Sequence, residues 1–210
     1  MNRALGFLFL FWSFLSVQAE EARVRIYLDP DQPALSKGVI LESGEVREQF
    51  QVGFGRNGID ESGARFRGGY SLLGKFQINA ILSADRFEMK PELIAESGKS
   101  VDYLKTHLFA NMSSIDFDGD GKGGEYGDAF ISLEDLSGRD QPFRFNVYKG
   151  KFRWYSYAIH GTQDSARIGK AVTGGCVNVG AENLSKVLKA VKLGDIVEVV
   201  NRNSENLLKN

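Results

Sequence analysis

The sequence contains one cysteine, two histidines and four prolines in 210 residues. A single cysteine excludes an intramolecular disulfide, a cysteine-based zinc finger and a cysteine-ligated iron–sulfur cluster. An excess of charge of one sign is also missing, because 26 basic residues face 27 acidic ones and the net charge is −1. This balance removes the electrostatic argument for a nucleic-acid partner or an anionic membrane surface. The remaining composition, 42% hydrophobic with 24 glycines, is that of a folded globular protein.

Residues 1–19 have the pattern of a secretory signal peptide. Arg3 is followed by an uncharged run over 4–17, which is shorter than the roughly 20 residues that cross a bilayer as a helix. The run ends in Val-Gln-Ala before two glutamates, and small residues at such a boundary mark a cleavage site. We expect cleavage after Ala19, no membrane span in the mature chain and a periplasmic or cell-wall location. The alternative is a permanent membrane anchor.

Alternating apolar residues predict a mainly β fold. Over 24–28, Val, Ile and Leu alternate with polar residues at the two-residue period of a half-buried strand. A hairpin is expected across 149–151, and apolar residues over 184–191 have the spacing of a helix that ends at Gly194. The other expected strands are 50–54, 74–78, 143–147, 155–159 and a central one at 196–200.

A segment with helical character interrupts the predicted strands. Residues 91–96 predict a short helix that begins with proline and stops at Gly98, and Ser100 is the expected N-cap of a second helix. We therefore expect one domain over 20–205 with a partly helical insertion at about 80–140, which covers one edge of the sheet.

The same segment contains an acidic loop. Asp116, Asp118 and Asp120 alternate before a glycine, as in the first half of a calcium-binding loop. A full loop needs a bidentate glutamate at its twelfth position, where the sequence has Gly127 and places Asp128 one residue late. Two interpretations stay open, a weak calcium site in an exported protein and a solvated acidic turn.

The residues with the clearest chemistry are His160 and Cys176. The thiolate is the attacking form of cysteine, and with an ordinary pKa of about 8.5 only a small fraction of a thiol ionises at neutral pH. A neighbouring imidazole can take the thiol proton and later return it to a leaving amine. Gly174 and Gly175 can adopt positive φ and turn backbone N–H groups toward a bound carbonyl. The plainer alternatives are a buried thiol, a packed histidine and an ordinary tight turn.

Three segments resemble the active-site signature of the L,D-transpeptidase catalytic domain family, namely Ile-His-Gly-Thr (159–162), Ile-Gly-Lys-Ala-Val (168–172) and Thr-Gly-Gly-Cys-Val-Asn (173–178). In that family a histidine that opens His-Gly-Thr assists a cysteine in a Ser/Thr-x-Gly-Cys turn. Residues 74–76 resemble a strand of the family, and 184–200 resemble its closing helix and strand, so the likeness covers most of the mature chain. Two positions depart from the pattern: Ser71-Leu72 replaces Thr-Pro, and Gly174 replaces a frequent histidine.

The resemblance implies an L,D-transpeptidase-type β-sandwich with a helix after the cysteine turn. It implies a cysteine acyltransferase without a cofactor that acts on the stem tetrapeptide of peptidoglycan, releases D-alanine and forms a 3→3 cross-link or related bond. Cys176 is then the nucleophile, His160 the general acid/base and Gly175 a backbone donor to the oxyanion. No metal ligand is expected, and the expected substrate-binding residues are Thr162, Thr173 and Asn178.

The resemblance leaves the acyl acceptor open. A second stem peptide as acceptor gives a cross-link, water makes the enzyme an L,D-carboxypeptidase, and the amine of a lipoprotein gives an anchor. The alternative from another functional class is a catalytically inactive, exported wall-binding domain. Rapid alkylation of the thiol near pH 6 would argue against that alternative. His107 is given no role.

Overall fold

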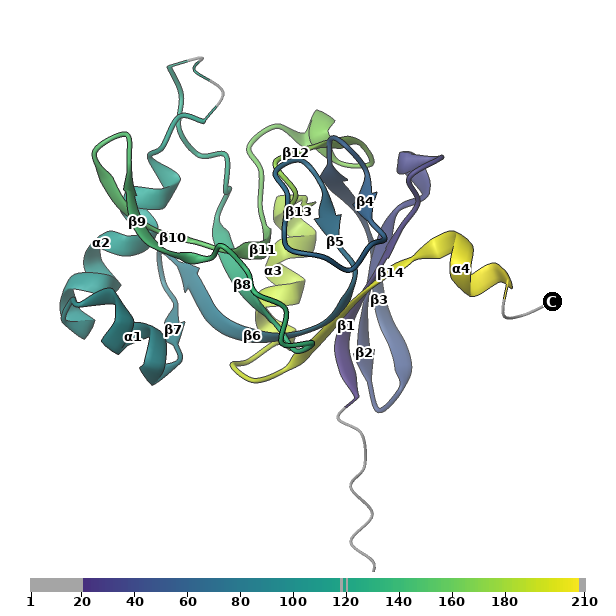
Figure 1. Cartoon of the computed structure of the whole chain (residues 1–210), viewed down its shortest axis with the longest axis horizontal. Coiled ribbons are helices and arrows are strands. Elements are labelled where there is room, and N and C mark those ends of the chain that lie inside the picture. The colour runs from purple at the N-terminus through teal and green to yellow at the C-terminus, as the bar shows by residue number, and fades with distance from the viewer. Residues whose placement is uncertain (1–20, 118, 120, 208–210) are drawn as a thin grey trace, which may run out of the picture.

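A computed structural model describes residues 21–207 except 118 and 120 (Figure 1). The expected signal segment 1–19 and its cleavage site therefore lie outside the described residues, as do Asp118 and Asp120 of the acidic loop. Within the described part of the chain, no helix has the length and apolar character needed to span a membrane.

Strands dominate the described residues, as the alternating sequence pattern predicts. The strands are β1 (Ala22–Leu28), β2 (Lys37–Glu42), β3 (Glu45–Gly55), β4 (Ile59–Asp60), β5 (Ser71–Leu72), β6 (Gly74–Ser83), β7 (Phe87–Met89), β8 (Ala129–Asp135), β9 (Arg144–Tyr148), β10 (Lys151–Tyr155), β11 (Tyr157–His160), β12 (Ala171–Thr173), β13 (Val177–Val179) and β14 (Ile196–Asn201). The α-helices are α1 (Pro91–Ser97), α2 (Val101–Ser113), α3 (Ala181–Ala190) and α4 (Arg202–Leu207), and short 3₁₀ turns occupy Pro33–Leu35 and Ser165–Arg167.

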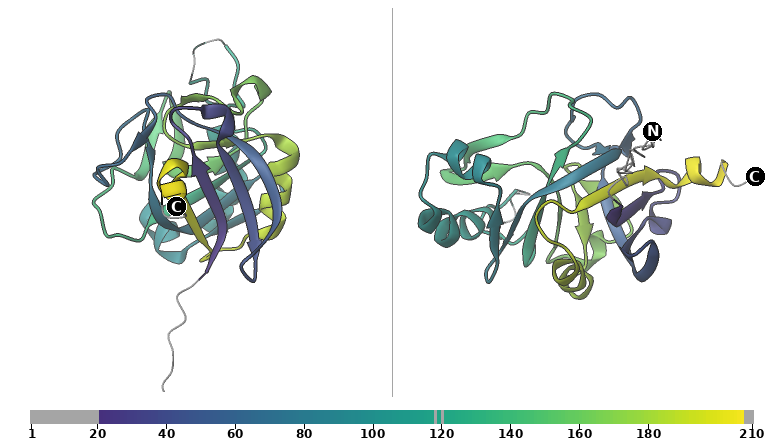
Figure 2. Two further views of the ribbon diagram at one scale, coloured as in Figure 1. Left: turned by 90° about the vertical axis from the view of Figure 1, so that its right-hand side faces the viewer. Right: turned by 90° about the horizontal axis from the view of Figure 1, so that it is seen from below.

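The main sheet closes on itself. Its strand order is β12-β3-β13-β11-β8-β6-β14-β1-β2, with β7 paired to β6 and a further pairing between β2 and β3. The β2–β3 pairing closes a ring of eight strands, so that β7 and β12 are the two strands of this sheet that lie outside the ring (Figure 2). The mainly β prediction is confirmed. The opposed walls of the ring pack face to face, as the layers of a sandwich do.

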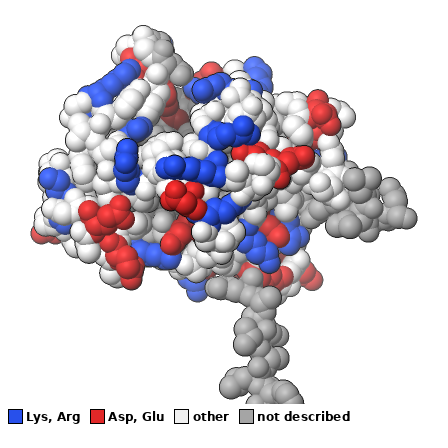
Figure 3. Space-filling view, in the orientation of Figure 1, with Lys and Arg blue, Asp and Glu red and all other residues white. Residues whose placement is uncertain are grey.

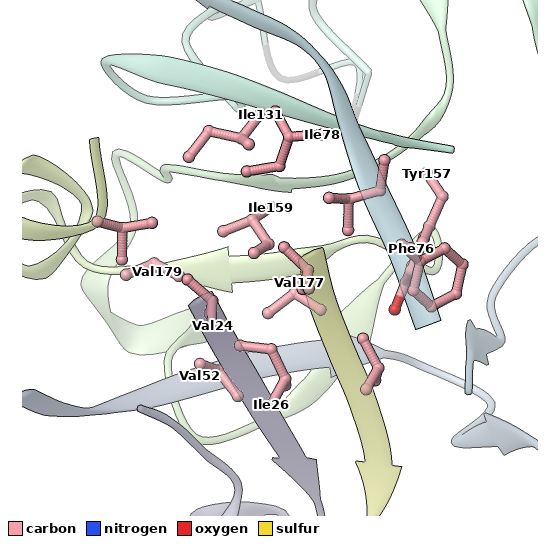
Figure 4. Close-up of a cluster of buried hydrophobic side chains, with 14 of the residues drawn as sticks. Val24, Ile26, Val52, Phe76, Ile78, Ile131, Tyr157, Ile159, Val177 and Val179 are labelled. Atoms are coloured by element: carbon pink, nitrogen blue, oxygen red, sulfur yellow. The ribbon is translucent and has the colours of Figure 1, made fainter. Parts of the chain in front are cut away.

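Every strand of the ring contributes side chains to the central core (Figure 4). In β1, buried and half-buried residues alternate, and Val24, Ile26 and Leu28 are all fully buried. The two-residue period therefore places one face of the strand in the core, where each such side chain contributes about 2 kcal/mol.

A second core lies between the barrel and the helical segment. Leu104, Leu108 and Met112 of α2 are buried there against Leu82 of β6 and Trp154 of β10. Figure 1 shows α1, α2 and the β9–β10 hairpin together at the end of the molecule opposite α4. This arrangement gives the barrel an apolar extension on that side.

Helix α1 begins and stops where the sequence predicts, and α2 begins at its predicted N-cap. Gly98 ends α1 in the left-handed conformation, with φ of 62°. The Ser100 side chain caps α2 by accepting the N–H of Tyr103 at 3.2 Å. A serine at this position satisfies one of the N–H groups that the first turn of a helix leaves without a partner.

The helical segment is shorter than the 80–140 expected for the insertion. The long strand β6 continues to Ser83, and β8 (Ala129–Asp135) lies inside the ring between β6 and β11. The first five residues of β8 are all buried. A strand that is buried on both faces has no alternation, so its pattern in the sequence does not separate it from a buried helix.

The predicted hairpin across 149–151 forms, but with a different second strand. β9 pairs with β10, and Lys149 and Gly150 take φ of 47° and 75° as in a type I′ turn. After Ser156 the chain leaves the hairpin and enters the barrel as β11, parallel to β13. This step brings His160 next to the strand that follows the cysteine.

Helix α3 ends earlier than the sequence predicts. α3 stops at Ala190, and the N–H of Val191 closes its last turn on Val187. Gly194 lies in the turn that follows, with φ of 89°, and leads into β14. β14 is paired on both sides, with β6 and β1, so the predicted central position of this strand is confirmed.

We predict that Ile26→Ala lowers the free energy of unfolding by about 2–5 kcal/mol, because the cavity remains inside a closed, packed core. Ile26 is 0% exposed, whereas Val46 on β3 is 58% exposed, and Val46→Ala should change stability by less than about 0.5 kcal/mol. Urea unfolding of the two variants measures the difference. Equal losses would contradict a core enclosed by the ring.

Candidate active site

Cys176 and His160 line one cleft of about 390 Å³. One side of the cleft is the β9–β10 hairpin, which contributes Tyr148, Arg153 and Tyr155. The opposite side is the segment from β12 to β13, which carries the cysteine turn. The loop before β8 supplies a third wall. Residues that are far apart in the sequence thus meet around the sulfur.

The register between β11 and β13 places the two expected catalytic side chains. These parallel strands pair Ile159 with Val177 and His160 with Asn178. Ile159 and Val177 are fully buried in the barrel core, so His160 and Asn178 lie on the other face. Cys176 immediately precedes β13 and lines the same cleft as His160 and Asn178.

The thiol of Cys176 is protonated in this site. Its Sγ donates to the carbonyl oxygen of Ser156 at 3.7 Å, and burial raises the pKa of the Cys176 thiol to about 12. Among the described residues no hydrogen bond joins the sulfur to His160. The S–H bond must therefore turn away from the Ser156 carbonyl before the imidazole can take its proton.

His160 is a buried, neutral base. The side chain is in a residue only 6% exposed, and its Nδ1 lies 2.7 Å from the carbonyl oxygen of Gly161. Because a carbonyl only accepts, Nδ1 carries the proton and Nε2 keeps a free lone pair. Burial lowers the pKa of His160 to about 4. The rings of Tyr126 and Phe130 pack on the imidazole with centroids 4.9 and 6.1 Å away.

Gly175 requires a residue without a side chain. Its φ is 131°, and a Cβ there would lie 2.6 Å from the Phe66 ring and 2.7 Å from the carbonyl oxygen of Tyr70. Both values are below any normal contact, and the backbone atom cannot move as a flexible side chain could. The glycine predicted for the turn is therefore needed for both conformation and space.

Two hydroxyl groups hold the cysteine turn. The Thr173 hydroxyl accepts the N–H of Gly175 at 3.0 Å and donates to the carbonyl oxygen of Cys176 at 2.6 Å. The Ser71 hydroxyl donates to the carbonyl oxygen of Gly175 at 2.6 Å and accepts the N–H of Gly55 at 3.0 Å. In the sequence, Ser71 is notable only as a departure from the family pattern. No sequence motif indicates that it bonds Gly175 and Gly55.

These bonds change which backbone donors are available to a bound carbonyl. The N–H of Gly175, the donor expected from the sequence, is already bonded to Thr173. The N–H of Cys176 has no hydrogen-bond partner within the described part of the chain. The N–H of Cys176 is thus the open donor of this turn among the described residues, and an oxyanion role for the turn stays a prediction.

The three expected substrate-binding residues occupy different places. Asn178 is 1% exposed and lines the cleft, and its Oδ1 has no hydrogen-bond partner among the described residues. Thr173 also lines the cleft, but its hydroxyl is used in the turn. Thr162 lines a neighbouring cavity, and its hydroxyl bonds the backbone of Asp164.

The acidic loop is organised by its own backbone. The carboxylate of Asp116 accepts the N–H groups of Gly119 and Gly121 at 2.5 and 3.0 Å, and Glu125 accepts the N–H of Phe117 at 2.7 Å. The described residues contain no group of three His, Cys, Asp or Glu that could hold a metal ion. Because two of the loop aspartates are outside this description, the calcium hypothesis stays a prediction.

A polar network next to Cys176 has no signal in the sequence motifs. The indole N–H of Trp154 donates to the Ser132 hydroxyl at 2.7 Å, which donates to the Ser156 hydroxyl at 2.8 Å. The backbone carbonyl of Ser156 accepts the hydrogen bond from the Cys176 thiol. Ser156 lies between β10 and β11, so the network fixes the step where the hairpin joins the barrel.

Comparisons with known proteins give one family and a set of solved structures. The model of the L,D-transpeptidase catalytic domain matches residues 25–199. Similar structures are an L,D-transpeptidase from Mycobacterium smegmatis (16% identity, 85% of this chain and 59% of that chain, TM-score 0.41) and one from Mycobacterium tuberculosis H37Rv (11%, 86% and 58%, 0.44). The chain spans about six-tenths of the length of these proteins. No curated protein matches the sequence.

In contrast to the rapid labelling near pH 6 expected from the sequence for an active enzyme, the buried neutral thiol predicts slow alkylation of Cys176 by iodoacetamide near pH 6, accelerating about tenfold per pH unit up to pH 9. The labelling rate therefore does not separate the neutral pair from an inactive domain. The pKa of the thiol is raised to about 12, so the thiolate fraction is still rising throughout this range. Mass spectrometry of the labelled peptide over time measures the rate. A plateau below pH 8 would show a preformed thiolate and contradict the neutral pair.

We also predict that Thr173→Val lowers the free energy of unfolding by about 1–3 kcal/mol, because the N–H of Gly175 then stays buried without a partner. Thr162→Val is the matched control, since its hydroxyl makes longer bonds in a different cavity. It should lose less stability. Urea unfolding compares the two, and a larger loss for Thr162→Val would show that Thr173 does not hold the turn.

Proposed function

The chain belongs to the L,D-transpeptidase catalytic domain family, and from this premise we propose that it is an exported cysteine acyltransferase acting on peptidoglycan stem tetrapeptides. The observation that supports the proposal is that His160 and Asn178 share one face of β11 and β13 and line one cleft with Cys176. A nucleophile, a base and a polar group for substrate are the minimum set for acyl transfer.

In the proposed acylation step, Cys176 Sγ attacks the carbonyl carbon at the L-centre of the third stem residue. The C–S bond forms while the thiol proton passes to Nε2 of His160. The backbone N–H of Cys176 donates to the oxyanion. Collapse of the intermediate breaks the C–N bond, and His160 returns the proton to the departing amine of D-alanine. The products are a thioester and free D-alanine.

The neutral resting pair supports proton transfer coupled to attack. A free thiolate is strongly disfavoured because burial raises the pKa of Cys176, and an isolated imidazolium is disfavoured because burial lowers the pKa of His160. When sulfur attacks as its proton leaves, the negative charge moves to the carbonyl oxygen, where a backbone N–H meets it. The site therefore avoids a long-lived buried charge.

In this proposal the remaining site residues hold the substrate or the cysteine turn in place. Asn178 presents an unpartnered Oδ1 that accepts a peptide N–H of the substrate. Thr173 holds the cysteine turn and acts through Cys176. Thr162 has no substrate contact in this scheme, because it lines a separate cavity.

We propose an amine of a second stem peptide as the acyl acceptor, which gives a 3→3 cross-link. Aromatic rings of Phe66, Phe117, Tyr126, Tyr148 and Tyr155 line the cleft. Such a lining lowers the local water content and disfavours hydrolysis of the thioester relative to attack by a bound amine. Cleavage after Ala19 and a periplasmic or cell-wall location complete the proposal.

We predict that purified protein converts isolated sacculi to new muropeptides and that Cys176→Ala forms none, because the thioester cannot form. His160→Gln should lower kcat by about 10²- to 10⁴-fold, the typical contribution of a general acid–base. His107→Gln is the matched control, because His107 is exposed and stacks on Tyr103 of α2. Liquid chromatography with mass spectrometry identifies the products.

The products also discriminate the acceptor. Dimers linked between third residues support the cross-linking reaction, whereas tripeptides alone indicate an L,D-carboxypeptidase. Unchanged turnover in a folded Cys176→Ala variant would refute the mechanism. A folded wild-type protein that yields no new product would leave an inactive wall-binding domain as the function.

A further inference from the structure

The charged side chains of the cleft are mostly basic. Arg56, Arg153 and Arg167 line it, against the single acidic residue Glu125. Over the molecular face shown in Figure 3, by contrast, basic and acidic side chains are interspersed. A concave site with an excess of one charge attracts a ligand of the opposite charge. The cleft is therefore suited to an anionic group, although the whole chain is nearly neutral.

Arg153 is fixed in one orientation by its neighbours. Its Nε donates to Asn146 Oδ1 at 2.9 Å, across a directly paired position of the hairpin. The guanidinium lies over the rings of Tyr148 and Tyr155, 4.4 and 5.2 Å from their centroids, and 5.7 Å from that of Phe117. Cation–π contacts of this kind hold the group in place without neutralising its charge.

No carboxylate in the described part of the chain forms an ion pair with Arg153. Three other partly buried arginines do have such a partner, in the pairs Arg25–Glu198, Arg139–Asp135 and Arg202–Asp29. A guanidinium presents five N–H donors in a planar fork, and Nε uses one of them here. Arg153 thus lines the cleft without a carboxylate paired to it among the described residues.

Arg153 and the sulfur line the same cleft, together with Tyr126 and Tyr155. The guanidinium lies 5.2 Å from the centroid of the Tyr155 ring. Burial raises the pKa of Tyr155, the Cys176 thiolate raises it further, and the Arg153 guanidinium lowers it. Arg153 therefore belongs to the wall of the space into which the sulfur faces.

We propose that Arg153 binds a carboxylate of the donor peptide and makes the site selective for anionic stem peptides. The inference rests on the proposed function. A planar guanidinium binds a carboxylate through two parallel hydrogen bonds, a geometry that a neutral amide cannot match. Two carboxylates of a tetrapeptide are candidates, the terminal one on the leaving D-alanine and the one at the D-centre of the third-residue diamino acid.

Binding of defined tetrapeptides to Cys176→Ala protein tests the proposal without turnover. Calorimetry compares three peptides, one with both carboxylates free, one with a C-terminal amide and one with an amide at the D-centre. Amidation of the bound carboxylate should raise Kd by about tenfold to a hundredfold, the usual effect of losing a charge-assisted pair. The amide that causes the loss identifies which carboxylate Arg153 binds.

The same measurement is then repeated on Cys176→Ala/Arg153→Gln. The double variant should bind the peptide with both carboxylates free as weakly as Cys176→Ala binds the peptide whose Arg153-bound carboxylate is amidated. Amidation should not weaken peptide binding to the double variant any further. Arg153→Lys keeps the charge without the fork and should fall between the two. Arg144→Gln is the matched control, because Arg144 is an exposed residue of the same hairpin that does not line the cleft.

Three results would overturn the proposal: equal affinity for all three peptides, no detectable binding, or an equal loss on all three peptides in the Arg153→Gln protein. The last result would indicate a role in the hairpin alone. Carboxylate-selective binding together with a wild-type protein that forms no thioester would refute the proposed catalysis and leave Arg153 as a binding residue. Turnover without discrimination between acid and amide would refute only the role of Arg153.

Discussion

The parallel pairing of β11 with β13 is the constraint on which the site depends. Ile159 and Val177 anchor this pair in the barrel core, and the alternation of side chains then sends His160 and Asn178 to the opposite face. A shift of one residue in either strand would bury a polar side chain in the core and turn an apolar one into the cleft. The stability of the core and the geometry of the candidate site are therefore set by the same register.

Burial then sets the chemistry of the site. Cys176 packs against both the barrel core and the second core beneath the hairpin. This environment keeps the thiol and the imidazole of His160 neutral, as the raised and lowered pKa values of the two groups show. A site of this kind has little reactivity of its own until a carbonyl is in place. A thiol that stays protonated is also less readily oxidised or alkylated than a thiolate.

The sequence is most informative where structure is local. The period of 24–28, the stop at Gly98 and the N-cap at Ser100 depend on neighbours within a few residues, and the structure confirms them. The position of β8 and the break at Ser156 depend on pairing between distant strands, which no local pattern encodes.

Within the candidate site, too, local motifs predict some residues and tertiary packing adds others, among them a charged one. Motifs mark His160 and Cys176, but Arg153 comes from a hairpin outside those motifs and reaches the cleft only through tertiary packing. An anionic peptide held near the sulfur would raise the free energy of every negative charge that develops during attack. A fixed guanidinium beside the peptide carboxylate removes that penalty, since the bound pair is neutral as a whole. In this proposal the hairpin supplies both aromatic rings that exclude water and the charge that binds an anionic substrate.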